Sequence, residues 1–217
     1  MGRAIATLFS SYMASRGNPR LGVALYLQVR KGLRPGELFD IRRSDVVLPS
    51  DMGSADSPES CIIGLGIRAN TKAKRPQSVI IFQSEFPQLM ELLNRICQVT
   101  ATNAKLFPYT IEHYRKEIHD IEDLLNLDFG FSAHSPRAGF ASEGRARGLS
   151  FTELREQGRW VADSSLRVYI DTVAASHISV ALRSKGLVPA LEFASRHILE
   201  YFPLASLASV FDTRFRR

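Results

Sequence analysis

Apolar residues recur at helical spacing along most of this chain. In NPRLGVALYLQVRKG (18–32) one stripe is formed by Leu21, Ala24, Leu25 and Val29, and this pattern predicts an amphipathic helix. The following GLRPGELFDI breaks that helix and starts another, because proline fits the first turn of a helix but not its interior. Helical patterns also fill most of the chain after residue 85, for example TIEHYRKEIHDIEDLLNL (110–127).

Three short runs rich in β-branched residues predict strands. They are DVVLP (45–49), CIIGLGIR (61–68) and SVIIF (78–82). A loop rich in Ser, Asp, Gly and Pro follows the first run, and the basic connector ANTKAKRPQ joins the other two. We expect a small antiparallel sheet that carries three cations at the tip of its hairpin, namely Lys72, Lys74 and Arg75. The predicted fold class is α+β, mostly α-helical with a small antiparallel β-sheet.

The stretch HSPRAGFASEGRARGLSFTELREQGRWVADSSLRVYI (134–170) contains the clearest local signal. Ser150 and Glu153 form an S-x-x-E capping box. We therefore predict a short helix from Phe151 to Gln157, with Gly158 as its natural C-terminal stop.

Composition narrows the possible classes of protein. The 217 residues fit one compact domain, and 28 Lys and Arg against 22 Asp and Glu give a formal net charge of +6, compatible with a polyanionic partner. Cys61 and Cys97 form neither a CxxC pair nor a Cys/His cluster at metal-ligand spacing. We therefore expect no disulfide framework, no metal and no cofactor. The apolar runs are far shorter than the roughly 18 to 20 residues that span a bilayer.

Several cationic residues could meet an anion. His134 and Arg137 stand three apart at the start of a predicted helix, so they can share one face near its partly positive N-terminus. In GLRPGEL, Glu37 can orient the Arg34 guanidinium, whose planar fork fits two oxygens of one phosphate. Lys72, on the hairpin connector, can protonate a leaving group. Taken singly, the plainer interpretations are favoured: a capped surface helix for His134 and Arg137, an exposed ion pair for Arg34 and Glu37, and a soluble turn for Lys72.

Two aromatic residues extend this set. Tyr169 shares a stripe with Leu166, Ile170 and Val173, which predicts a helix that carries it. On periodicity alone it is a core aromatic, because a phenol with a pKa of about 10 attacks poorly unless cations stabilise its oxyanion. Trp160, the only tryptophan, fits either the core or the rim of such a cationic cluster, where its indole N–H can reach a phosphate oxygen.

Taken in order, these pieces resemble the tyrosine recombinase and phage integrase family (Cre- and Xer-like). The matching pieces are GLRPGEL with Arg34 and Glu37, TK with Lys72, HSPRAGFAS with His134 and Arg137, GRW with Trp160, and finally Tyr169. The interval of nine residues from Trp160 to Tyr169 is also similar to that of the family. The resemblance runs from about residue 21 to residue 170 and implies the catalytic-domain fold of these enzymes.

The resemblance implies DNA strand cleavage and rejoining without metal, nucleotide or other cofactor. Tyr169 would attack the scissile phosphate and form a 3′-phosphotyrosyl bond, while Arg34 and Arg137 clamp the non-bridging oxygens. The other implied roles are a proton donor to the leaving 5′-oxygen (Lys72, with Lys74 as the alternative), a hydrogen-bond donor or acid/base partner (His134), support for Arg34 (Glu37) and a phosphate-positioning residue (Trp160).

The resemblance also implies partners. Double-stranded DNA would be bound by Arg34, Lys72, Lys74, Arg75 and Arg137, and the protein would act as a homo-oligomer, a tetramer, on that DNA. No membrane is implied, and the location follows the DNA, in the nucleoid or the nucleus. Mobile-element integration and chromosome maintenance both remain open.

We expect the catalytic domain to occupy residues 1–174. The DNA-gripping domain that precedes it in most family members has no counterpart in the residues before Arg34. Residues 175–217 would form a helical tail. Its apolar stripe consists of Leu191, Ala194, Ile198 and Tyr201, and it either packs on this domain or contacts another protomer.

Three other interpretations compete with this one. A type IB topoisomerase uses the same set of residue types and would relax supercoiled DNA without exchanging strands. A non-cleaving DNA-binding module derived from a recombinase would keep the fold and lack the activity. A helical protein with chance matches would need five coincidences in the right order.

Overall fold

The computed structural model describes residues 1–52, 59–66, 77–170 and 172–209. Its longer helices are α1 (Arg3–Ser15), α2 (Pro19–Lys31), α4 (Pro87–Gln98), α5 (Ile111–Leu124), α6 (Ser135–Ala146), α7 (Phe151–Gly158), α9 (Thr172–Ser184) and α10 (Val188–Arg196). Short turns of helix are α3 (Pro35–Leu38), α8 (Asp163–Arg167), α11 (Leu204–Ala208), η1 (Arg43–Asp45), η2 (Pro49–Asp51) and η3 (Ile198–Tyr201). The strands are β1 (Val46–Val47), β2 (Ser60–Leu65) and β3 (Gln77–Phe82). The predicted α+β class is confirmed.

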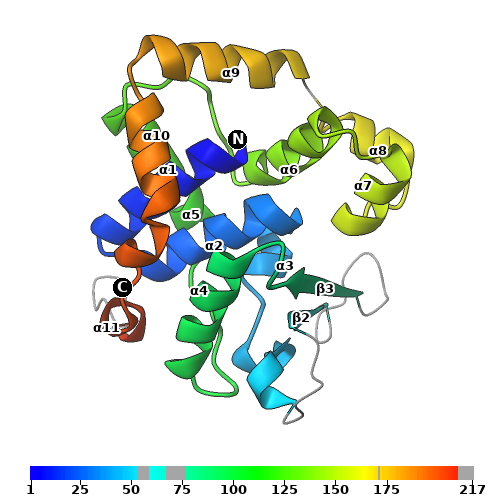
Figure 1. Ribbon diagram of the computed structural model, residues 1–217, viewed down its shortest axis with the longest axis vertical. Coiled ribbons are helices and arrows are strands. Elements are labelled where there is room, and N and C mark those ends of the chain that lie inside the picture. The colour runs from blue at the N-terminus through cyan, green and yellow to red at the C-terminus, as the bar shows by residue number, and fades with distance from the viewer. Residues whose placement is uncertain (53–58, 67–76, 171, 210–217) are drawn as a thin grey trace.

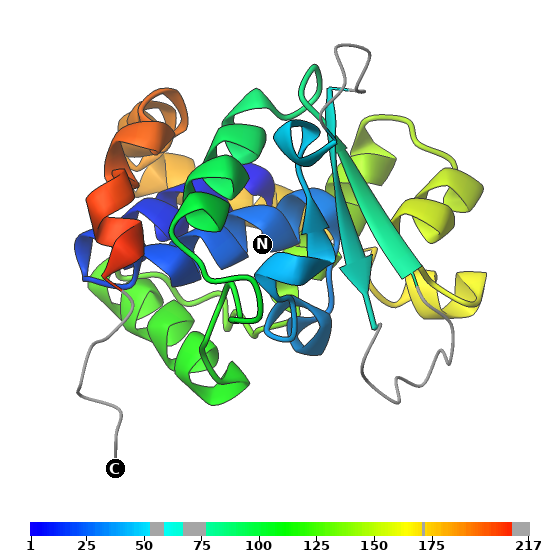
Figure 2. The same cartoon turned by 90° about the horizontal axis from the view of Figure 1, so that it is seen from below.

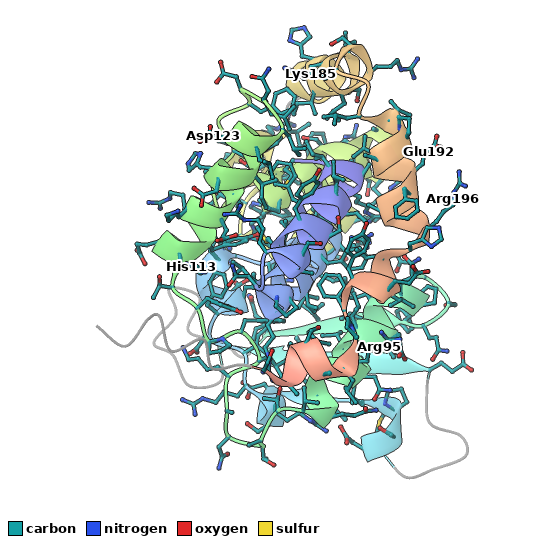
Figure 3. The ribbon with its side chains drawn as sticks, turned by 90° about the vertical axis from the view of Figure 1, so that its left-hand side faces the viewer. Arg95, His113, Asp123, Lys185, Glu192 and Arg196 are labelled. Carbon is teal, nitrogen blue, oxygen red and sulfur yellow. The ribbon has the colours of Figure 1, made fainter. Side chains whose placement is uncertain are left out.

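Helices α1 and α2 lie side by side at the centre of the molecule (Figure 1). Every residue of α2 from Pro19 to Val29 is buried, so the single apolar stripe predicted for this helix understates its burial. Its polar members are satisfied inside: the Arg20 guanidinium donates to the Leu207 carbonyl (2.7 Å) and to the Thr100 hydroxyl (2.9 Å). Seen from the side, α1 runs between α5 and α10 (Figure 3).

Figure 2 shows the strands of the small sheet with the blue and green helices on one side and the yellow-green helices on the other. The strand order is β1-β2-β3, all antiparallel, and the register pairs Val46 with Ile63 and Ile63 with Val79. One face is buried in the core, as the alternating burial of β3 shows. The basic residues predicted at the hairpin tip, Lys72, Lys74 and Arg75, lie outside the described residues.

The first predicted strand is shorter than expected. Only Val46 and Val47 pair with β2, whereas the pattern predicted a strand over residues 45–49. The Asp45 carboxylate accepts the Arg42 N–H (2.8 Å) and closes the turn η1, and Pro49, which has no N–H to donate, begins the turn η2.

The helical tail returns to the body of the chain. Helix α10 and η3 pack on α1, and α11 packs on α4 and α2. Ile198, Phe202 and Leu207 are fully buried, and a Cβ on Gly22 would lie 2.9 Å from the Phe202 ring. The apolar stripe of the tail is therefore used within this chain, and α9 crosses the boundary expected between residues 174 and 175. A further contact of this tail with another protomer stays a prediction.

A second, smaller core lies beside the main one. It is formed by Phe140, Ala141, Leu154, Trp160 and Leu166, which come from α6, from α7 and the segment after it, and from α8. Tyr169 and Phe151 pack against it, half-buried. The stretch 134–170 thus folds around its own aromatic centre, next to the end of α2.

In the described part of the chain, no helix is long and apolar enough to cross a membrane.

Candidate active site

Helix α6 carries the first two candidate residues. His134 is the N-cap residue and Pro136 lies in the first turn. The Arg137 side chain turns inward and is buried, whereas His134 stays exposed, so the two side chains do not present one common surface. Burial first, and then the charges of Arg137, Arg115 and Arg34, lower the pKa of His134, so the imidazole is neutral at neutral pH.

Arg137 ties three segments together. Its Nη2 donates to the Gly158 carbonyl (2.7 Å), and its Nη1 donates to the Gly32 carbonyl. Both acceptors are at helix C-termini, where backbone carbonyls have no partner within the helix. Burial, followed by the like charges of Arg34 and Arg159, lowers the pKa of Arg137. These two hydrogen bonds compensate a buried guanidinium that would otherwise be costly.

Arg34 and Glu37 form the pair predicted from GLRPGEL. Arg34 precedes the single turn α3, and Glu37 accepts both the Arg34 N–H (2.8 Å) and the Arg34 Nη1 (2.6 Å). The Arg34 side chain is 40% exposed and that of Glu37 only 10%. Burial acts to raise the pKa of Glu37, but the charge of Arg159 and the hydrogen bonds from Arg34 outweigh it and lower that pKa. Glu37 is therefore an ionised anchor that leaves part of the Arg34 guanidinium open to solvent.

The GRW segment supplies the next elements of the site. The predicted helix is present as α7, with its Ser150/Glu153 capping box, and it ends at Gly158, one residue later than predicted. The left-handed conformation that follows the helix is adopted by the C-cap residue Arg159 (φ 56°) and not by the glycine. A glycine is required at position 158 for another reason, because a Cβ at this position would overlap the Trp160 ring.

Trp160 lies in the small aromatic core. Its ring stacks on Phe140 (centroids 6.3 Å apart, planes at 16°), and the guanidinium carbon of Arg137 lies 3.9 Å from its ring centroid. The indole Nε1 is buried and has no hydrogen-bond partner among the described residues. A buried donor of this kind is a candidate to bind an oxygen of a ligand.

Tyr169 is not on a helix, contrary to the stripe prediction. Helix α8 ends at Arg167, and the Tyr169 and Ile170 N–H groups bond to the carbonyls of residues three positions earlier, so the chain tightens into a turn. The Ser142 hydroxyl of α6 donates to the Tyr169 carbonyl (3.1 Å). The phenol ring is half-buried, 5.7 Å from the Trp160 ring and 6.0 Å from the Arg137 guanidinium carbon.

The structure joins most of the predicted residues in one cluster. Arg34 Nη2 donates to the Arg159 carbonyl (3.1 Å), directly after the Gly158 carbonyl that Arg137 binds. These two neighbouring carbonyls connect the Arg34–Glu37 pair to Arg137, whose guanidinium in turn lies beside the rings of Trp160 and Tyr169. His134 begins the helix that carries Arg137, whereas Lys72 lies outside the described residues.

Sequence reasoning missed a buried polar network beneath the cluster. Gln28, fully buried in α2, donates to the carbonyls of Leu33 (3.1 Å) and Ala133 (3.0 Å) and accepts the Tyr114 hydroxyl (2.6 Å). Leu33 and Ala133 directly precede Arg34 and His134, so the network fixes the two segments against each other. The one available signal was a glutamine within the most apolar part of the chain.

Arg159 was also missed, although it stands between Gly158 and Trp160. Its Nη2 pairs with the Glu37 carboxylate (3.1 Å), and its side chain is only 6% exposed.

Among the described residues, no group of three or more His, Cys, Asp and Glu side chains could hold a metal ion.

No protein-family model and no curated protein matches this sequence. The solved structures that resemble its fold include two of the site-specific recombinase XerH bound to DNA. The complex with the difH substrate before cleavage is 14% identical, with a TM-score of 0.55 over 78% of this chain. The complex with a palindromic difH substrate after cleavage is 15% identical, with a TM-score of 0.58 over 84%. This chain spans about half the length of those proteins (49% and 51%) and has the α+β fold of a recombinase catalytic domain.

Proposed function

We propose that this protein cleaves and rejoins DNA strands through a covalent 3′-phosphotyrosyl intermediate with Tyr169 as the nucleophile. One observation carries the proposal. The Arg137 guanidinium carbon lies 6.0 Å from the Tyr169 ring centroid, and Arg34 is bound to the Arg159 carbonyl, next in the chain to the Gly158 carbonyl that binds Arg137. A half-buried phenol with one guanidinium beside it, and a second guanidinium held on the segment that leads to Trp160, suits attack on a phosphodiester.

The chemistry uses only side chains of this protein. The Tyr169 oxygen forms a bond to the scissile phosphorus and loses its proton, for which we propose the His134 imidazole as the acceptor. Arg34 and Arg137 stabilise the charge on the non-bridging oxygens, and the buried Trp160 Nε1 donates to one of them. The bond from phosphorus to the 5′-oxygen breaks, and Lys72 or Lys74 protonates that oxygen.

Rejoining reverses this step. The 5′-hydroxyl of the same or a second strand attacks the phosphotyrosyl phosphorus, and Tyr169 leaves as the phenol. The phosphoester bond energy is kept in the covalent link, so the cycle balances without nucleotide hydrolysis or metal. Exchange between two duplexes requires several copies, and we propose a homo-oligomer on double-stranded DNA.

The test is capture of the intermediate. The protein is incubated with a library of nicked duplexes in which cleavage releases a short oligonucleotide that diffuses away, and the covalent adduct is detected as a shifted band in denaturing gels. We expect an adduct with wild type and none with Tyr169→Phe, which removes one hydroxyl and keeps the aromatic packing. Equal absence of adduct from both proteins across the library would refute the proposal.

Strand exchange and DNA relaxation share this intermediate, and a second assay separates them. If adduct-forming protein relaxes supercoiled plasmid but exchanges no strands between two duplexes that carry the selected site, it is a type IB topoisomerase-like enzyme. The shared fold with XerH favours strand exchange.

A further inference from the structure

Arg159 has an unusual backbone conformation for an arginine. In the described part of the chain, Asn126 and Arg159 are the residues other than glycine with a positive φ, and that of Arg159 is 56°. This region disfavours residues with a Cβ, and glycine is the usual occupant at the end of a helix. An arginine held there suggests that its side chain has a role that glycine could not fill.

Arg159 contacts both members of the Arg34–Glu37 pair. Its carbonyl accepts a hydrogen bond from Arg34 Nη2 (3.1 Å), and its own Nη2 donates to Glu37 Oε2 (3.1 Å). The same nitrogen lies 3.5 Å from the Gly32 carbonyl, to which Arg137 also donates. Arg159 therefore contacts a group that holds each candidate phosphate-binding arginine: Glu37, which orients Arg34, and the Gly32 carbonyl, which binds Arg137.

Burial separates Arg159 from Arg34 in function. The Arg159 side chain is 6% exposed, whereas that of Arg34 is 40% exposed. Nη1 is occupied by the Gln157 carbonyl (3.1 Å) and Nη2 by Glu37. The terminal nitrogens of Arg34 are bonded to the Glu37 carboxylate and the Arg159 carbonyl as well, but the Arg34 side chain is open to solvent, so a phosphate would meet Arg34 and not Arg159.

The charges explain what Arg159 does for Arg34. Without Arg159, the buried Glu37 carboxylate would be balanced by Arg34 alone, and a phosphate would compete with Glu37 for the same guanidinium. With Arg159 present, one oxygen of Glu37 is paired elsewhere. Arg34 is then oriented by Glu37 and keeps charge available for an anion.

We infer that Arg159 is a positioning residue, which neutralises Glu37 and fixes the Arg34 guanidinium toward the scissile phosphate. This inference rests on the proposed function for the identity of the anion. The fixation of Arg34 itself is a property of the protein without DNA, so it can be tested separately.

Two substitutions isolate the side chain. Arg159→Gly keeps, and favours, the left-handed backbone while removing the guanidinium, so loss of function cannot come from an unsuitable turn. Arg159→Lys keeps the positive charge but has a single terminal nitrogen in place of two. The matched control is Arg196→Gln: Arg196 pairs with Glu192 (3.3 Å) on the outer face of α10 (Figure 3), where both side chains are well exposed.

The first measurement needs no DNA. Phenylglyoxal, which modifies unpaired guanidinium groups, is applied to the folded protein, and mass spectrometry follows the rate at which Arg34 is modified. We expect this rate to fall severalfold in Arg159→Gly, because Glu37 then pairs with Arg34 alone, to fall less in Arg159→Lys, and to stay unchanged in Arg196→Gln. An unchanged Arg34 rate in Arg159→Gly would overturn the inference, whatever the protein does to DNA.

The second measurement is the rate of adduct formation on the nicked duplex selected with wild type. We expect Arg159→Gly to slow it by about ten- to a hundredfold, as for a misplaced catalytic group, with partial recovery in Arg159→Lys. In a Glu37→Gln background, Arg159→Gly should add little further loss, because the two residues act through one pair. A full additional loss in that background would overturn the inference.

These outcomes are distinguishable from a failure of the proposed function. If wild type forms no adduct while Arg34 modification still slows in Arg159→Gly, the positioning role stands and the cleavage proposal fails. If wild type forms adduct and Arg159→Gly equals it in both measurements, the positioning role fails and the cleavage proposal stands.

Discussion

The Arg137 guanidinium carbon lies 3.9 Å from the centroid of the Trp160 ring. A cation over an aromatic face in a water-excluded site is stabilised by about 2 kcal/mol or more. The contact joins α6 to the segment after α7, so a buried cation and the only tryptophan behave as one unit. Gly158, whose carbonyl binds Arg137, also leaves the space that the Trp160 ring fills.

Gly158→Ala should displace Trp160 without removing any functional group. A Cβ at residue 158 overlaps the indole ring, so the ring must rotate or the turn must open. Because Trp160 is the only tryptophan, its emission spectrum reports the change directly, and we expect a red shift together with loss of adduct formation. Gly36→Ala is the control, since a Cβ there meets no atom within 4 Å. An unshifted spectrum in Gly158→Ala would contradict the packing described.

Arg137→Lys should destabilise the fold as well as the reaction. A lysine ends in a single nitrogen and cannot span the two carbonyls that the guanidinium fork reaches, so the Gly32 or the Gly158 carbonyl loses its partner. A buried acceptor left without its donor costs about 1 to 3 kcal/mol, measured as a lower free energy of unfolding in urea. Arg196→Lys on the exposed face of α10 should change it little. Equal effects of the two substitutions would argue against the buried role of Arg137.

Tyr114→Phe tests the network below the site. It removes the hydroxyl that donates to Gln28 (2.6 Å) and leaves a fully buried amide oxygen without that donor, at a cost of about 1 to 3 kcal/mol. Because Gln28 holds the residues before Arg34 and His134, adduct formation should slow while affinity for DNA is retained. Tyr26→Phe removes a comparable bond to Gln88 (2.8 Å) away from these segments. It should lower stability without slowing adduct formation on folded protein.

Glu37 should contribute to the loss of folding stability as pH falls. Its folded-state pKa is lowered below the usual 4.5, because Arg159 and the hydrogen bonds from Arg34 outweigh the opposite effect of burial. Glu37 therefore binds fewer protons in the folded than in the unfolded state. Its stabilisation is complete above the unfolded value and is lost as pH falls through the folded one.

The free energy of unfolding between about pH 6 and pH 3 should consequently fall less steeply in Glu37→Gln than in wild type. Urea midpoints across this range measure the slope. Glu192→Gln, which removes an exposed carboxylate from α10, is the control and should keep the wild-type slope. A parallel curve for Glu37→Gln would show that this carboxylate titrates normally.

Lys72 and Lys74 can be distinguished by the leaving group. A DNA substrate with sulfur in place of the scissile 5′-oxygen releases a thiolate, which departs without protonation. We expect Lys72→Ala to slow cleavage of the oxygen substrate by about 10²- to 10⁴-fold and to recover on the sulfur substrate. Lys74→Ala should show neither effect. The reverse pattern would assign the proton donor to Lys74.

Local patterns determined much of the fold. The capping box at Ser150 and Glu153 predicted α7 to within one residue, and the apolar stripe of residues 18–32 predicted α2. The strands at 61–68 and 78–82 were found as β2 and β3. These signals succeed because a cap, a stripe or an alternation depends on residues a few positions apart. The stripe that included Tyr169 misled, because α8 ends after Arg167 and the next residues tighten into a turn.

The sequence by itself determined which chemical groups are available and the order in which they occur. Only the tertiary structure decided how they are held. Arg137, Arg34 and Gln28 bind backbone carbonyls of Gly32, Gly158, Arg159, Leu33 and Ala133. Every residue carries a carbonyl, so no side-chain identity marks these acceptors. The carbonyls of Gly32, Gly158 and Arg159 are available because α2 and α7 end there and leave acceptors unpaired, and those of Leu33 and Ala133 lie in connections between helices. The side chains reach them only once distant segments have packed together.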